Sequence, residues 1–209
     1  MDDLVLRAMQ RWPDVPAVYG WLRLDRRGRW MLVDRGMPGF DEVRDAAGSP
    51  ITSEQIVEFI GRNYQADPQG RWYWQNGPQR VFVDLELAPL VLRVLGSGPD
   101  ARLVAHTGEP VSRVDGAWRT ADGDLILATD LGPGAVHDLD LASLEFGAGG
   151  EDEELPATLR VMDTEVRILA PRDAPADAFD ARPREPARPP ALSGSPGPAA
   201  RACTPPAAP

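Results

Sequence analysis

Lysine is absent from this chain of 209 residues, and all 22 of its basic residues are arginine. This absence excludes a Schiff-base lysine, a phosphate-loop lysine and a lysine general base. Cysteine is almost absent as well, because the one thiol, Cys203, lies close to the C-terminus. A disulfide within the chain and a thiolate zinc site are therefore excluded.

Histidine and long apolar runs are also scarce. The two histidines, His106 and His137, lie in no His-x-x-x-His or Gly-x-Ser-x-Gly context, so we expect structural or solvated roles for both. No run of about 18 apolar residues occurs. The first residues lack the basic and apolar regions of a signal peptide. A cytoplasmic protein without a membrane partner is expected.

Proline is abundant only at the C-terminal end. Residues 171–209 hold 11 of the 22 prolines and lack apolar periodicity, so we expect this tail to be disordered. Residues 1–170 carry 17 arginines against 28 acidic residues, within a total net charge of -10. Because such a surface repels nucleic acid, and no arginine stripe is visible, nucleic acid is not an expected partner.

Residues 1–170 predict one α+β domain with a predominantly antiparallel sheet, with a division into subdomains 1–95 and 96–170 left open. A short N-terminal helix is expected over residues 2–11. The main helix is expected over residues 53–64, because Thr52 and Gln55 fit a capping box and Ile56, Phe59 and Ile60 recur at helical spacing.

Two hairpins dominate the first half of the chain. The first covers residues 18–33 and places Leu24 opposite Trp30 and Leu22 opposite Leu32. The second covers residues 71–84 with a loop at 76–79. Its predicted pairs are Arg71 with Asp84, Trp72 with Val83, Tyr73 with Phe82, Trp74 with Val81 and Gln75 with Arg80.

The second half predicts a meander of short strands. Strands are expected at 90–95, 102–106, 118–119 and 125–128, with a final hairpin over 159–169. Turns or loops are expected at 132–134 and 147–154. Residues 35–50 read as a loop or a marginal helix, and residues 138–146 as a strand or one helical turn.

Three segments share a pattern of aspartate, glycine and tryptophan. Asp25-x-x-Gly-Arg-Trp30 is repeated as Asp67-x-x-Gly-Arg-Trp72, and more loosely as Asp115-Gly-x-Trp118. An internal duplication explains the pattern, and so does the repeated use of one kind of turn.

The second hairpin also supplies the candidate site. One face of it and its loop combine aromatic and polar side chains beyond what a turn needs. Alternating aromatic residues on a strand more often form core contacts, so both readings stay open. The candidate ligand-binding residues are Arg71, Tyr73, Asn76, Gln79, Arg80, Phe82 and Asp84.

The leading hypothesis is a non-enzymatic binding or regulatory domain for a protein or small-molecule partner, with no cofactor, no metal and no catalytic residue assigned. One alternative is an acid-based or metal-assisted enzyme that uses Asp122, Asp124, Asp138 and Asp140. Another is a structural subunit of a homo- or hetero-oligomer.

The stretch from Arg11 to Arg93 resembles an uncharacterised proteobacterial family known only as a domain of unknown function. The resemblance rests on Arg11-Trp12-Pro13, Tyr19-Gly20-Trp21-Leu22, residues 24–30, residues 56–64 and, above all, the block Gly70-Arg71-Trp72-Tyr73-Trp74-Gln75-Asn76-Gly77-Pro78-Gln79-Arg80-Val81. The order of elements is also similar to a second bacterial family of unknown function, with repeated α+β motifs and a suggested signalling role. The second resemblance implies a fold class and a non-enzymatic role, and carries over no catalytic residue.

Overall fold

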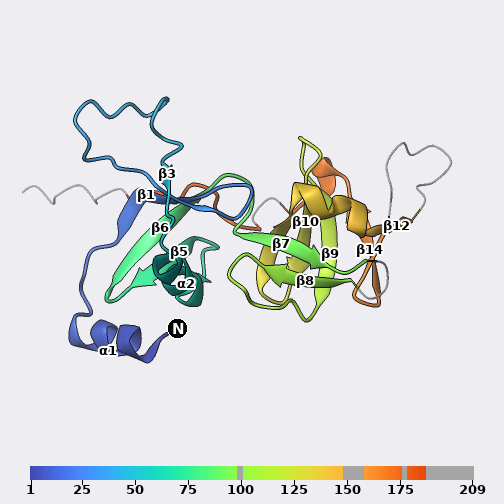
Figure 1. Cartoon of the computed structure of the whole chain (residues 1–209), viewed down its shortest axis with the longest axis horizontal. Helices are drawn as coiled ribbons and strands as arrows, with labels where there is room; N and C mark the ends of the chain where they lie inside the picture. The colour runs from blue at the N-terminus through green and yellow to red at the C-terminus, as the bar shows by residue number, and fades with distance from the viewer. Residues whose placement is uncertain (98–100, 148–157, 176–177, 187–209) are drawn as a thin grey trace, which may run out of the picture.

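Two β-sheets lie side by side along the long axis of the molecule, and the two α-helices belong to the N-terminal sheet (Figure 1). This computed structural model describes residues 1–97, 101–147, 158–175 and 178–186. The α+β class is confirmed, with helices α1 (Asp3–Arg11) and α2 (Glu54–Arg62) where the sequence predicts them. Neither helix of the described chain has the length and apolar character needed to cross a membrane.

The first sheet has six strands in the order β3-β2-β1-β6-β5-β4. The β1–β6 pair is parallel and the other pairs are antiparallel. The strands are β1 (Val18–Leu24), β2 (Trp30–Leu32), β3 (Ser49–Pro50), β4 (Tyr64–Ala66), β5 (Trp72–Asn76) and β6 (Gln79–Leu85).

The predicted register of both hairpins is found in this sheet, although the ladder of the second begins at Tyr73 with Phe82 and does not include the predicted pairs Arg71 with Asp84 and Trp72 with Val83. Leu24 pairs with Trp30 in the first hairpin, and Gln75 pairs with Arg80 in the second. The second ladder continues to Asn76 and Gln79, so only residues 77–78 turn the chain, whereas a four-residue loop was expected. The apolar side of this sheet packs against α2, whose Ile60 has no exposed surface.

The second sheet has eight strands in the order β12-β13-β14-β9-β10-β11-β7-β8 and encloses the larger core. The pairs β11–β7 and β14–β9 are parallel. The strands are β7 (Leu90–Leu95), β8 (Arg102–Ala105), β9 (Val114–Arg119), β10 (Leu125–Thr129), β11 (Gly132–Val136), β12 (Glu145–Gly147), β13 (Thr158–Val161) and β14 (Thr164–Leu169), with 3-10 helices η2 (Asp138–Ser143) and η3 (Pro171–Asp173).

One prediction for this half of the chain is wrong. Residues 132–134, expected as a turn, lie in strand β11. A Cβ at Gly134 would lie 2.7 Å from the side chain of Leu92, so close packing between strands accounts for the glycine there. The strand expected at 118–119 is the end of β9, which also contains residues 115–118. The segment 138–146 contains both alternatives, a 3-10 helix followed by the start of β12. Most of the loop expected at 147–154 is outside the described residues.

One turn closes four hairpins, at residues 25–29, 67–71, 105–109 and 120–124. In each, the first residue's N–H donates to the carbonyl of the fifth, and a glycine N–H at the fourth position donates back to the first. All four glycines have positive φ, as this three-residue loop requires. Because the turns at 105–109 and 120–124 lack the Asp-x-x-Gly-Arg-Trp sequence, repeated turn chemistry accounts for the pattern without a duplication.

The two Asp-x-x-Gly-Arg-Trp turns deliver their tryptophans to the contact between the sheets. The ring of Tyr64 lies between Trp30 and Trp72, with centroid distances of 4.9 Å to each. His106, from the second sheet, lies 5.2 Å from Trp30 and 6.0 Å from Tyr64. Trp72 is part of the core of the second sheet although its strand belongs to the first.

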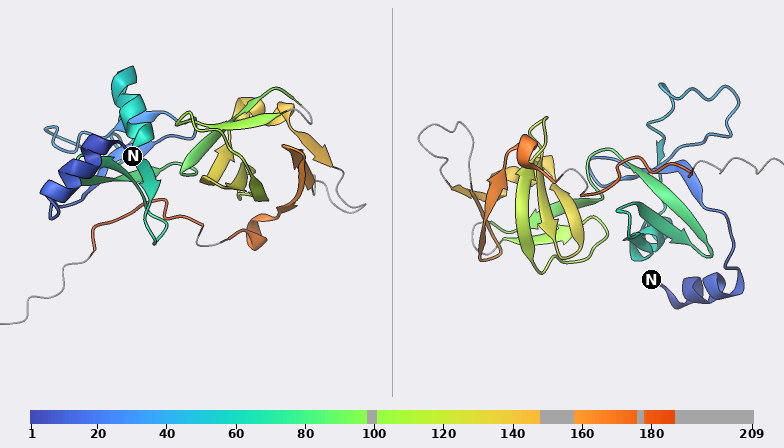
Figure 2. Two further views of the ribbon diagram at one scale, coloured as in Figure 1. Left: turned by 90° about the horizontal axis from the view of Figure 1, so that it is seen from below. Right: turned by 180° about the vertical axis from the view of Figure 1, so that it is seen from behind.

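The segment after β14 returns to the first sheet, as Figure 2 shows. Asp180 donates its N–H to the carbonyl of Gly70, and the carbonyl of Ala181 accepts from Leu85. Phe179 packs against all three apolar clusters. The tail expected to be disordered thus includes ordered segments, residues 171–175 and 178–186, which contact both sheets. Residues 187–209 are outside the described chain.

Replacing Gly28 tests the contact between the sheets. A Cβ at Gly28 would lie 2.8 Å from Cβ of His106, whereas a Cβ at Gly123, with a similar φ, meets nothing within 4 Å. Both G28A and G123A suffer the strain of a positive φ. We expect G28A to lower the free energy of unfolding by about 2 kcal/mol more, because only it overpacks the contact. Urea denaturation measures the difference, and equal losses would contradict the packing argument.

His106 predicts a pH dependence of stability. Burial lowers its pKa from 6.5 to about 4, and its Nδ1 accepts a hydrogen bond from the N–H of Val91. Between these two pH values the unfolded chain binds a proton that the folded chain does not, so stability falls as the pH is lowered through this window.

The variant H106N keeps an acceptor for Val91 and removes the titration. Relative to H106N, the native chain should lose about 3 kcal/mol of unfolding free energy between pH 7 and pH 4. Carboxylates such as Asp25 and Asp67 titrate in both proteins, so their effect cancels in the difference. Parallel stability curves for the two proteins over this range would show that His106 does not titrate this way.

Candidate binding site

The face of the first sheet opposite α2 carries the predicted aromatic residues. Tyr73 and Phe82 point to this face and are 4% and 2% exposed, although no helix of the described residues covers them. Tyr19 stacks on Phe82 with a centroid distance of 4.7 Å, and the guanidinium of Arg71 lies 4.8 Å from the same ring. Arg80 covers Tyr73 at 4.9 Å. The two rings therefore form a sealed layer and not an open aromatic platform.

Two of the predicted residues, Arg71 and Asp84, are held in ion pairs. Arg71 contacts the buried carboxylate of Asp67 at 2.6 Å. Burial raises the pKa of Asp67, but hydrogen bonds from the Arg71 side chain and from backbone N–H groups outweigh it, so the pKa lies below its usual value. Asp84 pairs with Arg184 of the C-terminal segment at 2.9 Å. The first pair holds the turn at residues 67–71, and the second attaches the C-terminal segment to β6. The charged groups of Arg71 and Asp84 are therefore already occupied by partners within the protein.

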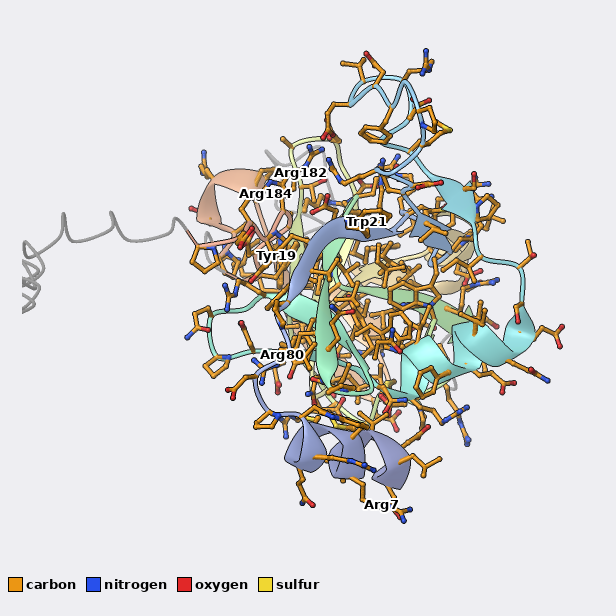
Figure 3. The ribbon with its side chains drawn as sticks, turned by 90° about the vertical axis from the view of Figure 1, so that its left-hand side faces the viewer. Arg7, Tyr19, Trp21, Arg80, Arg182 and Arg184 are labelled. Carbon is orange, nitrogen blue, oxygen red and sulfur yellow. The ribbon has the colours of Figure 1, made fainter. Side chains whose placement is uncertain are left out.

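The remaining predicted residues surround the tip of the β5–β6 hairpin. Gln79 donates a hydrogen bond to the carbonyl of Pro16 at 3.2 Å and so holds the linker between α1 and β1 against the hairpin. Asn76 is exposed at the end of β5. Arg80 is exposed and has no acidic partner within the described residues. Figure 3 shows Arg80 beside the hairpin, on the side nearer to α1 than Arg182 and Arg184 are.

A groove of about 460 Å³ runs between α1, the α1–β1 linker and the β5–β6 hairpin. Six of its eight lining residues have apolar side chains, although polar atoms contribute nearly as much of its surface as apolar atoms do. Among the described residues that line it, Arg80 is the charged one and none is acidic. Trp12 is half-exposed in it and Gln75 is its one fully buried lining residue. The lining residues are Met9, Trp12, Pro13, Val15, Ala17, Gln75, Pro78 and Arg80.

Gln75 is the residue of this groove that the sequence analysis missed as a site residue. Its Nε2 donates to the carbonyl of Gly77 at 2.9 Å, and its backbone N–H donates to Asn63 at 2.8 Å. Its side-chain oxygen Oε1 is buried without a hydrogen-bond partner among the described residues. Its pairing opposite Arg80 was the available signal, because it places a polar amide on the face that buries Tyr73.

A second hollow, of about 400 Å³, lies where the two sheets meet. Its polar side chains are mostly engaged: the Tyr64 hydroxyl donates to the carbonyl of Pro89, and Asp130 accepts from the Ser112 hydroxyl and two backbone N–H groups. Thr107 Oγ1 is the buried lining atom without a partner. This hollow has less free polar chemistry than the groove beside Arg80.

The four aspartates of the metal hypothesis do not meet. Asp124 pairs with Arg26 at 3.0 Å, Asp138 with Arg27 at 2.8 Å, and Asp140 with Arg93 at 2.6 Å. Asp122 is exposed in its turn. Among the described residues, no group of three or more His, Cys, Asp or Glu side chains is arranged to hold a metal ion.

His137 is buried at the start of η2, where its Nδ1 accepts a hydrogen bond from the N–H of Leu139 at 3.2 Å. The Nδ1 of His106 likewise accepts a hydrogen bond from the N–H of Val91. Both histidines therefore accept backbone hydrogen bonds, as expected of structural residues.

The chain belongs to a family of unknown function: the DUF2944 family model, described as "Protein of unknown function (DUF2946)", matches residues 1–179. A search of curated proteins finds no match.

Two solved structures are similar. A DUF1285 family protein from Silicibacter pomeroyi DSS-3 has 14% identity and a TM-score of 0.49, over 81% of this chain and 96% of that chain. A DUF1285 family protein from Shewanella baltica OS155 has 14% identity and a TM-score of 0.41, over 58% and 87%.

Two arginine substitutions separate structure from binding. We expect R71Q to lower the free energy of unfolding by about 2–3 kcal/mol, because it leaves the buried Asp67 carboxylate without its cation. R80Q should cost less than about 1 kcal/mol, because it removes only an exposed cation–π contact. Urea denaturation followed by tryptophan fluorescence measures both. Comparable losses would assign Arg80 a structural role.

Proposed function

We propose that this protein is a non-enzymatic binding domain whose site is the groove between α1 and the β5–β6 hairpin. One observation carries the proposal: the exposed guanidinium of Arg80, which has no acidic partner among the described residues, lines this groove together with residues whose side chains are mostly apolar. Ligand sites typically combine apolar walls with a few convergent polar groups in this way.

The composition of the groove favours an anionic ligand with an apolar part. Arg80 supplies the one charge of the lining, and Met9, Trp12 and Val15 supply apolar surface. Each of the aspartates and histidines that suggested catalysis is exposed in a turn, paired with arginine or bonded to the backbone. These assignments support binding over acid–base or metal chemistry.

The residues predicted from the sequence contribute unequally to this proposal. Arg80 contacts the ligand directly, while Asn76 flanks the groove. Gln79 holds the linker that forms one wall. The pairs Tyr73 with Phe82 and Arg71 with Asp67 support the sheet beneath Arg80, and Asp84 belongs to the attachment of the C-terminal segment.

A thermal-shift screen of the full chain tests the proposal. Amino acids, carboxylic acids, nucleotides and short peptides are compared on the native chain, on R80Q and on R182Q, which removes an exposed arginine outside the groove. A ligand at about 100 times its Kd should raise Tm by about 5 °C or more in the native chain and in R182Q.

The same ligand should raise Tm much less in R80Q. Ligands that stabilise all three proteins equally would place the site elsewhere. A screen in which no compound class stabilises the native chain would contradict binding of these ligands.

A further inference from the structure

The β5–β6 hairpin is open at its base, where the C-terminal segment lies between its two strands. Continued beyond its last pair, the hairpin register would place Gly70 opposite Leu85. Instead, the carbonyl of Gly70 accepts a hydrogen bond from the N–H of Asp180 at 3.0 Å. The N–H of Leu85 donates to the carbonyl of Ala181 at 2.8 Å. The segment therefore takes up backbone groups of both strands, as a bound extended peptide does.

Side chains of the segment fix its position in this gap. Phe179 packs against the apolar clusters of both sheets, and its Cα lies 3.5 Å from where a Cβ of Gly70 would stand. Arg184 forms an ion pair with Asp84 of β6 at 2.9 Å, and the preceding Pro183 is buried. The gap thus recognises an aromatic side chain, two backbone groups, a proline and a cation in a fixed order.

The segment is held like a bound peptide and not like a strand of the core. Residues 178–186 contain neither helix nor strand, and a turn in which the carboxylate of Asp180 accepts the N–H of Arg182 shapes them. The side chain of Arg184 is 57% exposed in its ion pair, and exposed pairs contribute little. Phe179, which is partly buried, therefore supplies most of the side-chain attachment.

The hairpin can close when the segment leaves. Gln75 directs its backbone N–H away from β6. Gly70 lies five positions before Gln75, so the alternation of an antiparallel ladder would make it a hydrogen-bonded partner of Leu85. Closure would also bring Arg71 opposite Asp84, the pair that the sequence predicts. Release therefore leaves neither these backbone groups nor the Asp84 carboxylate without a partner.

We propose that this gap is a binding site for an extended peptide of the sequence Phe-Asp-Ala-x-Pro-Arg, filled here by residues 179–184 of the same chain, and that two copies of the chain associate by exchanging this segment. Exchange keeps every contact and joins the copies through two identical gaps, as a symmetric dimer requires. The site lies at the base of the hairpin, whereas the groove beside Arg80 lies at its tip. The inference therefore does not rest on the proposed function.

Reversing the charges of the ion pair in two separate proteins tests the exchange. In D84R the gap and the segment both carry arginine, and in R184D both carry a carboxylate. Each variant alone therefore repels the segment, within a chain and between identical copies. In a mixture, the segment of each variant matches the gap of the other. We expect heterodimers to exceed the homodimers of either variant about tenfold or more in native mass spectrometry of the full chains.

A mixture of D84R with R182D is the matched control. Arg182 is exposed and does not pair with Asp84, so reversing its charge restores no contact. No excess of heterodimer is expected in this mixture. If D84R and R184D stay monomeric together, or associate no more than the control pair, the exchange is refuted.

A labelled peptide of residues 178–186 tests the site itself by fluorescence anisotropy. In the native chain the segment competes with the peptide at a high effective concentration, and F179A removes the anchor of that competitor. The peptide should bind F179A about tenfold or more tightly than it binds the native chain. A peptide with alanine in place of Phe179 should bind neither protein. Failure of the native peptide to bind F179A more tightly would contradict the site.

Hydrogen exchange on the native chain tests release of the segment without any substitution. The N–H of Asp180 is protected by Gly70, and release exposes it while the sheets stay folded. Its opening free energy should lie below that of Val81 in the β5–β6 ladder, and it should not change at low urea concentrations. Equal opening free energies for the two amides would mean that the segment leaves only on global unfolding, and would exclude exchange between folded copies.

Discussion

The contact between the two sheets depends on one ring, that of Tyr64, which lies between Trp30 and Trp72. Each tryptophan follows a turn in which an aspartate accepts hydrogen bonds from backbone N–H groups and from the arginine just before the tryptophan. The turns therefore set the direction of both indoles, and the indoles set the position of the second sheet through His106. Exposed ion pairs at the periphery, such as Arg26 with Asp124, add little to this apolar contact.

The same arrangement explains why the candidate site lies at the other end of the second hairpin. Trp72 begins β5 inside the core of the second sheet, and the strand runs outward until Gln75 meets α1 and the linker. At the inner end every large side chain is packed. At the outer end the small first sheet has only a nine-residue helix and a linker to cover it. The groove beside Arg80 exists because α1 and the linker cover this end of the sheet only in part.

Local patterns predicted the elements well. The pairing of Gln75 with Arg80 followed from complementary neighbours along two strands, and α2 from apolar spacing. Three features were not readable in this way. Strand β11 has the glycines and proline of a turn, but its glycines are explained by close packing, because a Cβ at Gly132 would approach Trp72 and a Cβ at Gly134 would approach Leu92. The attachment of the C-terminal segment depends on distant partners such as Asp84. The groove needs α1 placed over Gln75, which no local pattern specifies.

The returning C-terminal segment determines the order in which the molecule is completed during synthesis. The strands of the first sheet are all available once β6 has been made, but Leu85 and Gly70 receive their last backbone partners from residues 180–181. The entire second sheet is synthesised in between. Because such distant contacts close late, the N-terminal half emerges from the ribosome first and is finished last. The chain thus has a built-in interval during which its N-terminal sheet lacks part of its cover.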